Sequence, residues 1–319
     1  KRHYLSTQTC SNHSGVAVVG QRVVIAVGAS LDANGATLRD AAPTGNALTA
    51  SALARARDAG IADLDRRASA IFVERIVPAL QRQSAALAAL QPRADDRAGI
   101  WAKPDGEAYY NARLRLSTTT DMSPAQIHDI GLKEVARIHG EMESIRDKVG
   151  FKGTLQQFFE YARTDPKFYF KSREDYLAAV EVVQNKVEPL LPRYFATLPK
   201  APLVVKPVEA FREQSAGKAF YQSPAPDGSR PGTYYVNLYR LEDMSRNELE
   251  ALYYHEGLPG HHLQRAVQTE LGDDVPAFRR FGGVTAYTEG WGLYAEELGK
   301  DMGLYTDPYS DFGRLGMEL

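Results

Sequence analysis

Apolar residues recur three or four positions apart through most of the chain, which is the spacing of amphipathic helices. The first long helical pattern covers residues 63–90, and Pro78 inside it predicts a kink or break because proline has no backbone N–H. Further helices are expected to begin at Ser123, Thr154 and Ser172, each followed three residues later by a capping partner. The expected buried stripe of the helix after Ser123 is Val135, Ile138, Met142 and Ile145. The pattern therefore predicts a mainly α fold.

The pattern changes to short β-type runs between residues 203 and 238. The runs, bounded by Pro, Gly and Ser, are Leu203–Val205, Lys218–Gln222 and Thr233–Leu238. They predict a small antiparallel sheet. An edge strand can pair with an extended peptide, so Tyr235 and Asn237 are the substrate contacts we expect. The alternative is that Tyr234, Tyr235 and Tyr239 only pack the sheet against the helical body.

After the sheet, Ser245 and Glu248 form a capping-box pattern that predicts the start of another helix. Its buried side is expected to consist of Leu249, Leu252 and Tyr253. The helix leads to His255 and Glu256 and should break directly afterwards. The reason is the segment 257–260, Gly-Leu-Pro-Gly, whose residues disfavour a continuous helix.

His255 and Glu256 match the beginning of the zinc-binding pattern H-E-x-x-H, but the position of its second histidine is Pro259. In an unbroken helix His261 would lie on another side, and His262 about 10 Å further along the axis. A break or bulge can bring one of these imidazoles back beside His255. We expect His261 to be the second ligand, with His262 as the alternative, and Glu256 to be the catalytic general base.

A catalytic zinc site usually holds three protein ligands and leaves one position open. The helical pattern over residues 287–296 carries Glu289 and Glu296, which are seven residues apart and share a face. We expect Glu289 to be the third ligand. Glu296 is expected to orient a ligating histidine or to serve as an alternative ligand. The plainer alternatives are that the glutamates form a solvated helix face and that the histidines are polar surface residues.

Residues 255–264 and 288–296 resemble the bacterial family called "domain of unknown function 885", whose members look like zinc metallopeptidases. Weaker matches lie between residues 104 and 120 and at residues 231–237, and the resemblance runs from about Ala62 to the end. It implies a mostly helical, metallopeptidase-like body with the small antiparallel sheet next to the metal helix. Such a fold is similar to the angiotensin-converting-enzyme and oligopeptidase group, with a deep groove over the metal.

Both ends of the chain differ from what this family leads us to expect. The family continues well past Leu319, which falls in what reads as an unfinished helix, so we expect a C-terminally truncated chain. Residues 1–46 are rich in Gly, Ala and Val and fit no part of the family pattern. The expected division is therefore an N-terminal segment of unknown role, residues 1–46, and a helical metallopeptidase-like domain, residues 47–319.

Composition agrees with a soluble enzyme. Apolar residues make up 44% of the chain, which is enough for a substantial core. A net charge of −2 without a basic block argues against a nucleic-acid partner, and the single cysteine excludes an internal disulfide. No apolar run is long enough for a transmembrane segment. The resemblance suggests a periplasmic or secreted protein, with a cytoplasmic location and the oligomeric state left open.

The expected activity is hydrolysis of peptide bonds, of the oligopeptidase or carboxypeptidase type. Zinc (Zn²⁺) held by His255, His261 and Glu289 would activate water, while Glu256 takes its proton and passes it to the leaving amine. No donor for the oxyanion is apparent before Leu319, and we expect it beyond that point. Two alternatives remain open: a non-catalytic peptide-binding or structural module that keeps the fold, and a hydrolase of a non-peptide amide.

Overall fold

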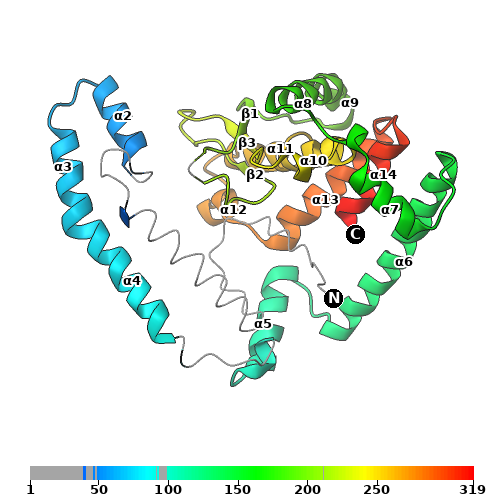
Figure 1. Cartoon of the computed structure of the whole chain (residues 1–319), viewed down its shortest axis with the longest axis horizontal. Coiled ribbons are helices and arrows are strands. Elements are labelled where there is room, and N and C mark those ends of the chain that lie inside the picture. Colours follow the sequence, from blue (N-terminus) through cyan, green and yellow to red (C-terminus); the bar gives the residue numbers. More distant parts are fainter. Residues whose placement is uncertain (1–38, 41–45, 47–48, 91, 93–98, 211) are drawn as a thin grey trace. The chain divides into compact units, whose positions relative to one another are not determined.

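The computed structural model describes residues 39–40, 46, 49–90, 92, 99–210 and 212–319. The N-terminal segment expected at residues 1–46 lies almost entirely outside this set, so its boundary stays a prediction. The described chain falls into two compact units that are joined between Ala112 and Arg113. As predicted, it is mainly helical with one small sheet (Figure 1).

The described part of the unit that ends at Ala112 is helical. Its elements are α2 (Ala50–Asp58), α3 (Leu64–Ile71), η1 (Phe72–Ile76), α4 (Val77–Leu90) and η3 (Ile100–Ala102), and α5 (Gly106–Thr118) runs across the boundary. Of the kink or break expected at Pro78, the break is wrong, because α4 continues through the proline. A π-helical turn, η1, directly precedes the proline. This wider turn accommodates the missing N–H without ending the helix.

Helices also dominate residues 113–319. They are α6 (Pro124–Lys148), α7 (Leu155–Thr164), α8 (Arg173–Val187), α9 (Leu191–Tyr194), α10 (Leu249–Glu256), α11 (His261–Thr269), α12 (Ala277–Phe281), α13 (Thr285–Asp301) and α14 (Pro308–Glu318). The predicted starts are confirmed: Ser123 and Thr154 form complete capping boxes, and the Ser172 hydroxyl accepts the Asp175 N–H. Among the described helices, none is both long enough and apolar enough to cross a bilayer.

The start of α10 differs from the prediction. The Ser245 hydroxyl accepts the N–H of Asn247 at 3.1 Å, and a 3-10 turn, η7 (Arg246–Glu248), precedes the helix. Glu248 does not complete a capping box, because its carboxylate pairs with Lys218 instead. A long-range ion pair has therefore replaced the local contact that the sequence suggested.

Two apolar cores hold residues 113–319 together. In the first, α8, the sheet, α10 and α13 share buried side chains, and Tyr234, Tyr253 and Tyr254 are fully buried. In the second, α6 packs against α7 and α14. The stripe predicted for α6 is buried at Ile138, Met142 and Ile145, but Val135 is 38% exposed. Burial begins one turn later than expected, since the first half of α6 contributes nothing to this core.

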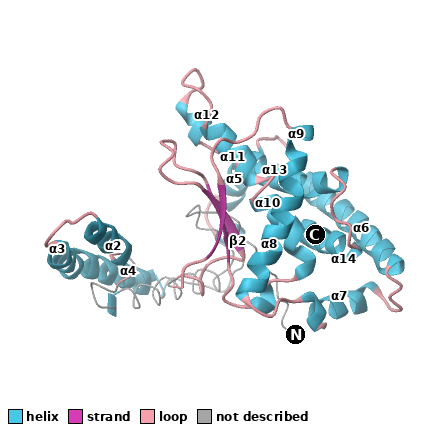
Figure 2. Ribbon diagram, turned by 90° about the horizontal axis from the view of Figure 1, so that it is seen from above, coloured by secondary structure: helices cyan, strands magenta, loops and turns pink. Residues whose placement is uncertain are grey.

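The sheet contains β1 (Leu203–Pro207), β2 (Ala219–Gln222) and β3 (Gly232–Val236) in the order β1-β3-β2. The predicted antiparallel sheet is wrong in one respect, because β3 pairs antiparallel with β2 but parallel with β1. The sheet is mixed since β3 inserts between the two earlier strands. It packs against α10 and α11, the helices that carry His255 and His261 (Figure 2).

Candidate metal centre

α10 and α11 are separated by the four residues 257–260, as the glycines and the proline predicted. A side chain at Gly260 would place its Cβ 2.0 Å from the carbonyl oxygen of His255, so only glycine fits this tight reversal. The Leu258–Pro259 peptide bond is cis. The indole N–H of Trp291, on α13, donates to the carbonyl of Pro259 at 2.9 Å and fixes the break against that helix.

The break brings together the three residues predicted as metal ligands. The Nε2 atom of His255 lies 3.4 Å from Oε2 of Glu289, and Nε2 of His261 lies 3.7 Å from the same oxygen. One donor atom from each of the three residues lies within 4.8 Å of the other two. Donors around a tetrahedral zinc ion are roughly 3.3–3.5 Å apart. Small side-chain adjustments would therefore close this set around one ion.

Burial also fits a metal ion. The side chains of His255 and His261 are 12% and 8% exposed, whereas Glu289 is 34% exposed. The Nε2 atom of His255 is buried and makes no hydrogen bond to any described residue. Its nearest partner is the Glu289 carboxylate at 3.4 Å, and an ion bound between the two would satisfy both groups. Glu289, at the open side, leaves access for water and a substrate.

Helix α13 also fixes the orientation of the His255 imidazole. The Nδ1–H of His255 donates to Oε1 of Glu296 at 2.7 Å, and the Glu296 side chain is only 4% exposed. A Cβ atom at Gly292 would lie 2.6–2.9 Å from three atoms of the same ring. Gly292 therefore leaves the space that the ring fills, while Glu296 fixes the tautomer with Nε2 facing Glu289. Both features depend on the close approach of α13 to α10 at Gly292.

The charges of His255, Glu289 and Glu296 depend strongly on one another. Burial favours neutral His255, but Glu289 and Glu296 on its two nitrogens raise the pKa of His255 to about 10. Burial opposes the charge on Glu289, yet the two histidines lower the pKa of Glu289 to about 2. Burial raises the pKa of Glu296 despite its bond to His255. Without a metal, the His255 imidazolium thus holds the cluster together.

Glu256, the expected general base, is the last residue of α10 and directly follows His255. It is 1% exposed. Its negative charge acts both on His255 and on Tyr234 of β3, so the carboxylate lies near both groups. This is the neighbourhood that a base acting beside the three candidate ligands requires.

His262 has a different environment from His261. Its Nε2–H donates to the carbonyl of Ala201 at 3.1 Å, and its Nδ1 then accepts the hydroxyl of Tyr221 at 2.9 Å. Burial lowers the pKa of His262 to about 4, so it stays neutral. Gly232 makes room for the pair, because a Cβ there would lie 2.4 Å from Nδ1. Both nitrogens are used, and the geometry favours His261 as the ligand.

The two expected substrate contacts are engaged within the fold. The Asn237 amide donates to the carbonyls of Glu213 and Ala216, and its oxygen accepts the Tyr239 N–H. Tyr235 stacks on Phe220 with ring centroids 4.8 Å apart. Their contact with substrate stays a prediction that these interactions do not support. The packing alternative is confirmed for Tyr234, which is fully buried against the helices, whereas Tyr235 stacks within the sheet and Tyr239 is 47% exposed.

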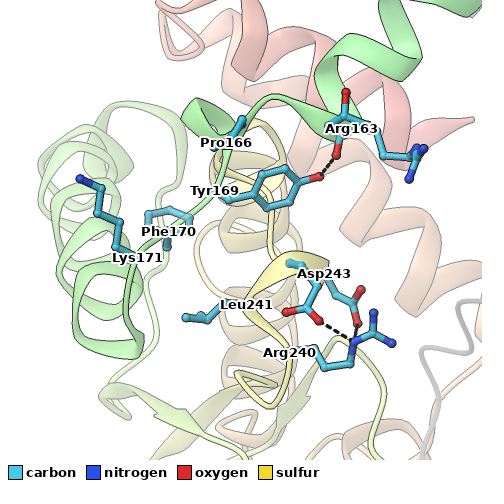
Figure 3. A pocket seen from close by; sticks show the side chains of 10 residues that line it. Arg163, Pro166, Tyr169, Phe170, Lys171, Arg240, Leu241 and Asp243 are labelled. Carbon is cyan, nitrogen blue, oxygen red and sulfur yellow. Dashed lines mark hydrogen bonds and ion pairs between the residues drawn. The ribbon is translucent and has the colours of Figure 1, made fainter.

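A cavity of about 730 Å³ lies between the end of α7 and the 3-10 turn η6 (Leu241–Asp243), and no candidate ligand lines it. Figure 3 shows the Tyr169 hydroxyl donating to the carbonyl of Arg163, and Arg240 facing Asp243. Arg240 is also paired with Glu242 at 3.0 Å. Arg240 is thus already neutralised, and the cavity is separate from the candidate metal centre because none of its ligands lines it.

Comparison with known protein families matches residues 8–319 to the family described as "Bacterial protein of unknown function (DUF885)". The chain belongs to this family. The match begins well before Ala62, where the motif resemblance started, and covers most of residues 1–46. No curated protein matches the chain.

Two solved structures are similar to this DUF885 member. A protein from Colwellia psychrerythraea, provisionally described as a lipoprotein, is 30% identical with a TM-score of 0.85, covering 94% of this chain and 52% of that one. A protein from Shewanella oneidensis, also provisionally a lipoprotein and of unknown function, is 18% identical with a TM-score of 0.56, covering 94% of this chain and 55% of that one. At 18% identity, the Shewanella oneidensis structure shows only that the fold is shared. The chain spans about half the length of either.

The contact at Gly292 predicts a selective loss of metal binding. In Gly292→Ala the new methyl group would displace the His255 ring, so we expect zinc affinity to fall about tenfold to hundredfold, measured by competition with a chromophoric chelator. Gly290→Ala is the matched control on the same helix, because nothing lies within 4 Å of its added Cβ. Equal affinities in the two variants would contradict the proposed packing of His255.

Metal binding should also depend on pH. Because the pKa of His255 is about 10 and that of Glu289 about 2, at pH 8 the histidine must lose a proton to bind a metal, while the glutamate is already ionised. Calorimetry in buffers of different ionisation enthalpy should detect this release of about one proton, with affinity rising up to about tenfold per pH unit below pH 10. In Glu296→Gln, which removes one stabilising carboxylate, the release should be smaller. Binding without proton release would count against His255 as a ligand.

Proposed function

We propose that this DUF885 member is a zinc-dependent hydrolase that cleaves peptide bonds. The observation that carries the proposal is the convergence of His255, His261 and Glu289 from three helices, with Glu256 at the end of the first. Two imidazoles and a carboxylate form the donor set of many catalytic zinc sites, which leave a further position open. The partial exposure of Glu289 supports an open rather than a closed site.

When bound, zinc supplies a Lewis acid that polarises the scissile carbonyl and lowers the pKa of water to roughly 7. The chain supplies the remaining functions. Glu256 accepts a proton as water attacks the carbonyl, and it passes that proton to the leaving amine, so that one water is consumed and a carboxylate and an amine are formed. Glu296 keeps Nδ1 of His255 protonated and the ring in place.

A non-catalytic protein is the second candidate, and one observation favours it. The cluster is held without a metal by the ion pairs of His255 with Glu289 and Glu296, which is enough for a purely structural role. The buried Glu256 beside it argues for chemistry, because a structural cluster gains nothing from another carboxylate. A hydrolase of a non-peptide amide would use the same residues and differ only in its substrate.

A location outside the cytoplasm forms part of the proposal. The protein from Colwellia psychrerythraea is provisionally described as a lipoprotein, and it shares 30% identity with this chain. A periplasmic or secreted peptidase is consistent with that description. Fractionation of cells that produce the protein tests this point, and recovery only with cytoplasmic markers would contradict it.

The decisive variant is Glu256→Gln, which keeps the size of the side chain and removes its basicity. We expect it to keep its zinc and its melting temperature, while hydrolysis of a mixed peptide library falls about 10²- to 10⁴-fold. Glu181→Gln, at an exposed position on α8, is the matched control, and it should change neither zinc content, melting temperature nor turnover. Unchanged turnover in Glu256→Gln would refute the mechanism, and loss of its zinc would make Glu256 a ligand.

A further inference from the structure

Two half-buried arginines near the metal centre lack a carboxylate partner. Arg265 lies on α11 one helical turn after His261, and Arg230 lies in the loop that leads from β2 to β3. Within the described residues, no Asp or Glu oxygen lies within 4.0 Å of either guanidinium group. The other arginines of residues 113–319 without such a partner are exposed. A half-buried charge without a counter-ion is costly unless a ligand supplies one.

Neutral groups hold both arginines in place. Nη1 of Arg265 donates to Oε1 of Gln268 at 2.7 Å and to the carbonyl of Gly282 at 2.9 Å. Nη1 of Arg230 donates to the carbonyl of Ser223 at 2.7 Å. The remaining N–H groups of both guanidinium groups make no hydrogen bond to described residues. Each arginine is therefore positioned with donors to spare, which is the state of an anion-binding arginine.

Tyr221 connects the two arginines with the metal centre. Its ring centroid lies 6.4 Å from that of His261. A Cβ atom built on Gly232, two residues after Arg230, would lie 2.6 Å from the hydroxyl oxygen of Tyr221. Burial raises the pKa of Tyr221, and the positive charges of Arg265 and Arg230 act against this effect. The negative charge of Glu270 raises the pKa of Tyr221 further. The Glu270 carboxylate itself accepts hydrogen bonds from the backbone N–H groups of residues 200 and 201 and does not pair with either arginine.

Arg265 also lies near the helix that carries the third candidate ligand. A Cβ atom built on Gly283 would lie 3.6 Å both from Nη1 of Arg265 and from the hydroxyl oxygen of Thr288. Thr288 directly precedes Glu289 on α13. Arg265 thus lies close to two of the three candidate ligands, one turn from His261 and beside the residue before Glu289. Arg240, in the cavity of Figure 3, differs because Glu242 and Asp243 neutralise it.

We propose that Arg265 and Arg230 bind the free α-carboxylate of a peptide and so place its C-terminal region at the metal centre. This inference rests on the proposed function and adds the direction of cleavage, that of a carboxypeptidase. The guanidinium group forms paired, charge-assisted hydrogen bonds with a carboxylate. A peptide that lacks the terminal charge would leave both arginines without a counter-ion and bind weakly. The recognised group is a carboxylate, which an Asp or Glu side chain also offers, so the test must separate the two sources.

The test measures binding to Glu256→Gln, so that hydrolysis does not interfere. The probes are acetyl-tetraalanine as the free acid, the same peptide as its C-terminal amide, and an amidated version with glutamate as the last residue. We expect calorimetry to show the free acid binding about tenfold to hundredfold more tightly than either amide. Equal binding of the free acid and the plain amide, no binding of the free acid, or equally tight binding of the amidated glutamate peptide would overturn the proposal.

Substitutions then assign the preference to residues. Adding Arg265→Gln or Arg230→Gln should abolish the preference for the free acid, whereas Arg265→Lys should keep part of it. Arg279→Gln removes the same charge from an exposed position on α12 and should change nothing. An equal loss in Arg279→Gln would reveal a general charge effect and overturn the inference. If the preference is found but the wild-type protein hydrolyses nothing, the carboxylate site stands and the proposed function fails. If the wild-type protein hydrolyses peptides but shows no preference for the free acid, the proposed function stands and the carboxylate site fails.

Discussion

The candidate site depends on how closely α13 packs against the imidazole of His255. Three residues on one face of α13 act on that ring. Glu289 faces its Nε2, Gly292 leaves the space that it fills, and Glu296 accepts its Nδ1–H. Their spacing of three and four residues puts them on one face of a helix. A side chain larger than hydrogen at Gly292 would separate the ligand from the residue that orients it.

The helix break is the second requirement, because it returns His261 to His255. Tyr254 and Tyr253 fix α10 in the core, and the tight reversal at Gly260 lets α11 begin only four residues after α10 ends. Three carboxylates, Glu256, Glu289 and Glu296, then surround two imidazoles. Such an excess of negative charge favours a cation, which is either the proton on His255 or a metal ion. Metal binding and protonation therefore compete for the same nitrogen.

Local signals in the sequence predicted much of this arrangement. Capping residues such as Ser123 and Thr154 act within three positions, and they were read correctly. Short motifs also singled out His255, His261 and Glu289, which the structure brings together. What the sequence did not show depends on distant partners: Glu248 pairs with a lysine 30 residues away, and His262 bonds to a tyrosine 41 residues away.

The parallel pairing of β1 was missed for a similar reason, since the insertion of β3 between the earlier strands has no local signature. The two arginines proposed to bind a carboxylate were not found from the sequence either. Among the described residues of 113–319, Arg230 and Arg265 differ from the other half-buried arginines in having no carboxylate within 4.0 Å, which only the three-dimensional structure shows.

The zinc content of purified protein, measured by elemental mass spectrometry, tests the metal centre most directly. We expect about one zinc per chain in the wild-type protein, as in other sites with three protein ligands. His261→Ala should lose it, while His262→Ala should keep it even if the loss of the Tyr221 contact lowers the melting temperature. Zinc that survives in His261→Ala but is lost in His262→Ala would contradict the ligand set, and a wild-type protein that binds no zinc would refute the metal centre.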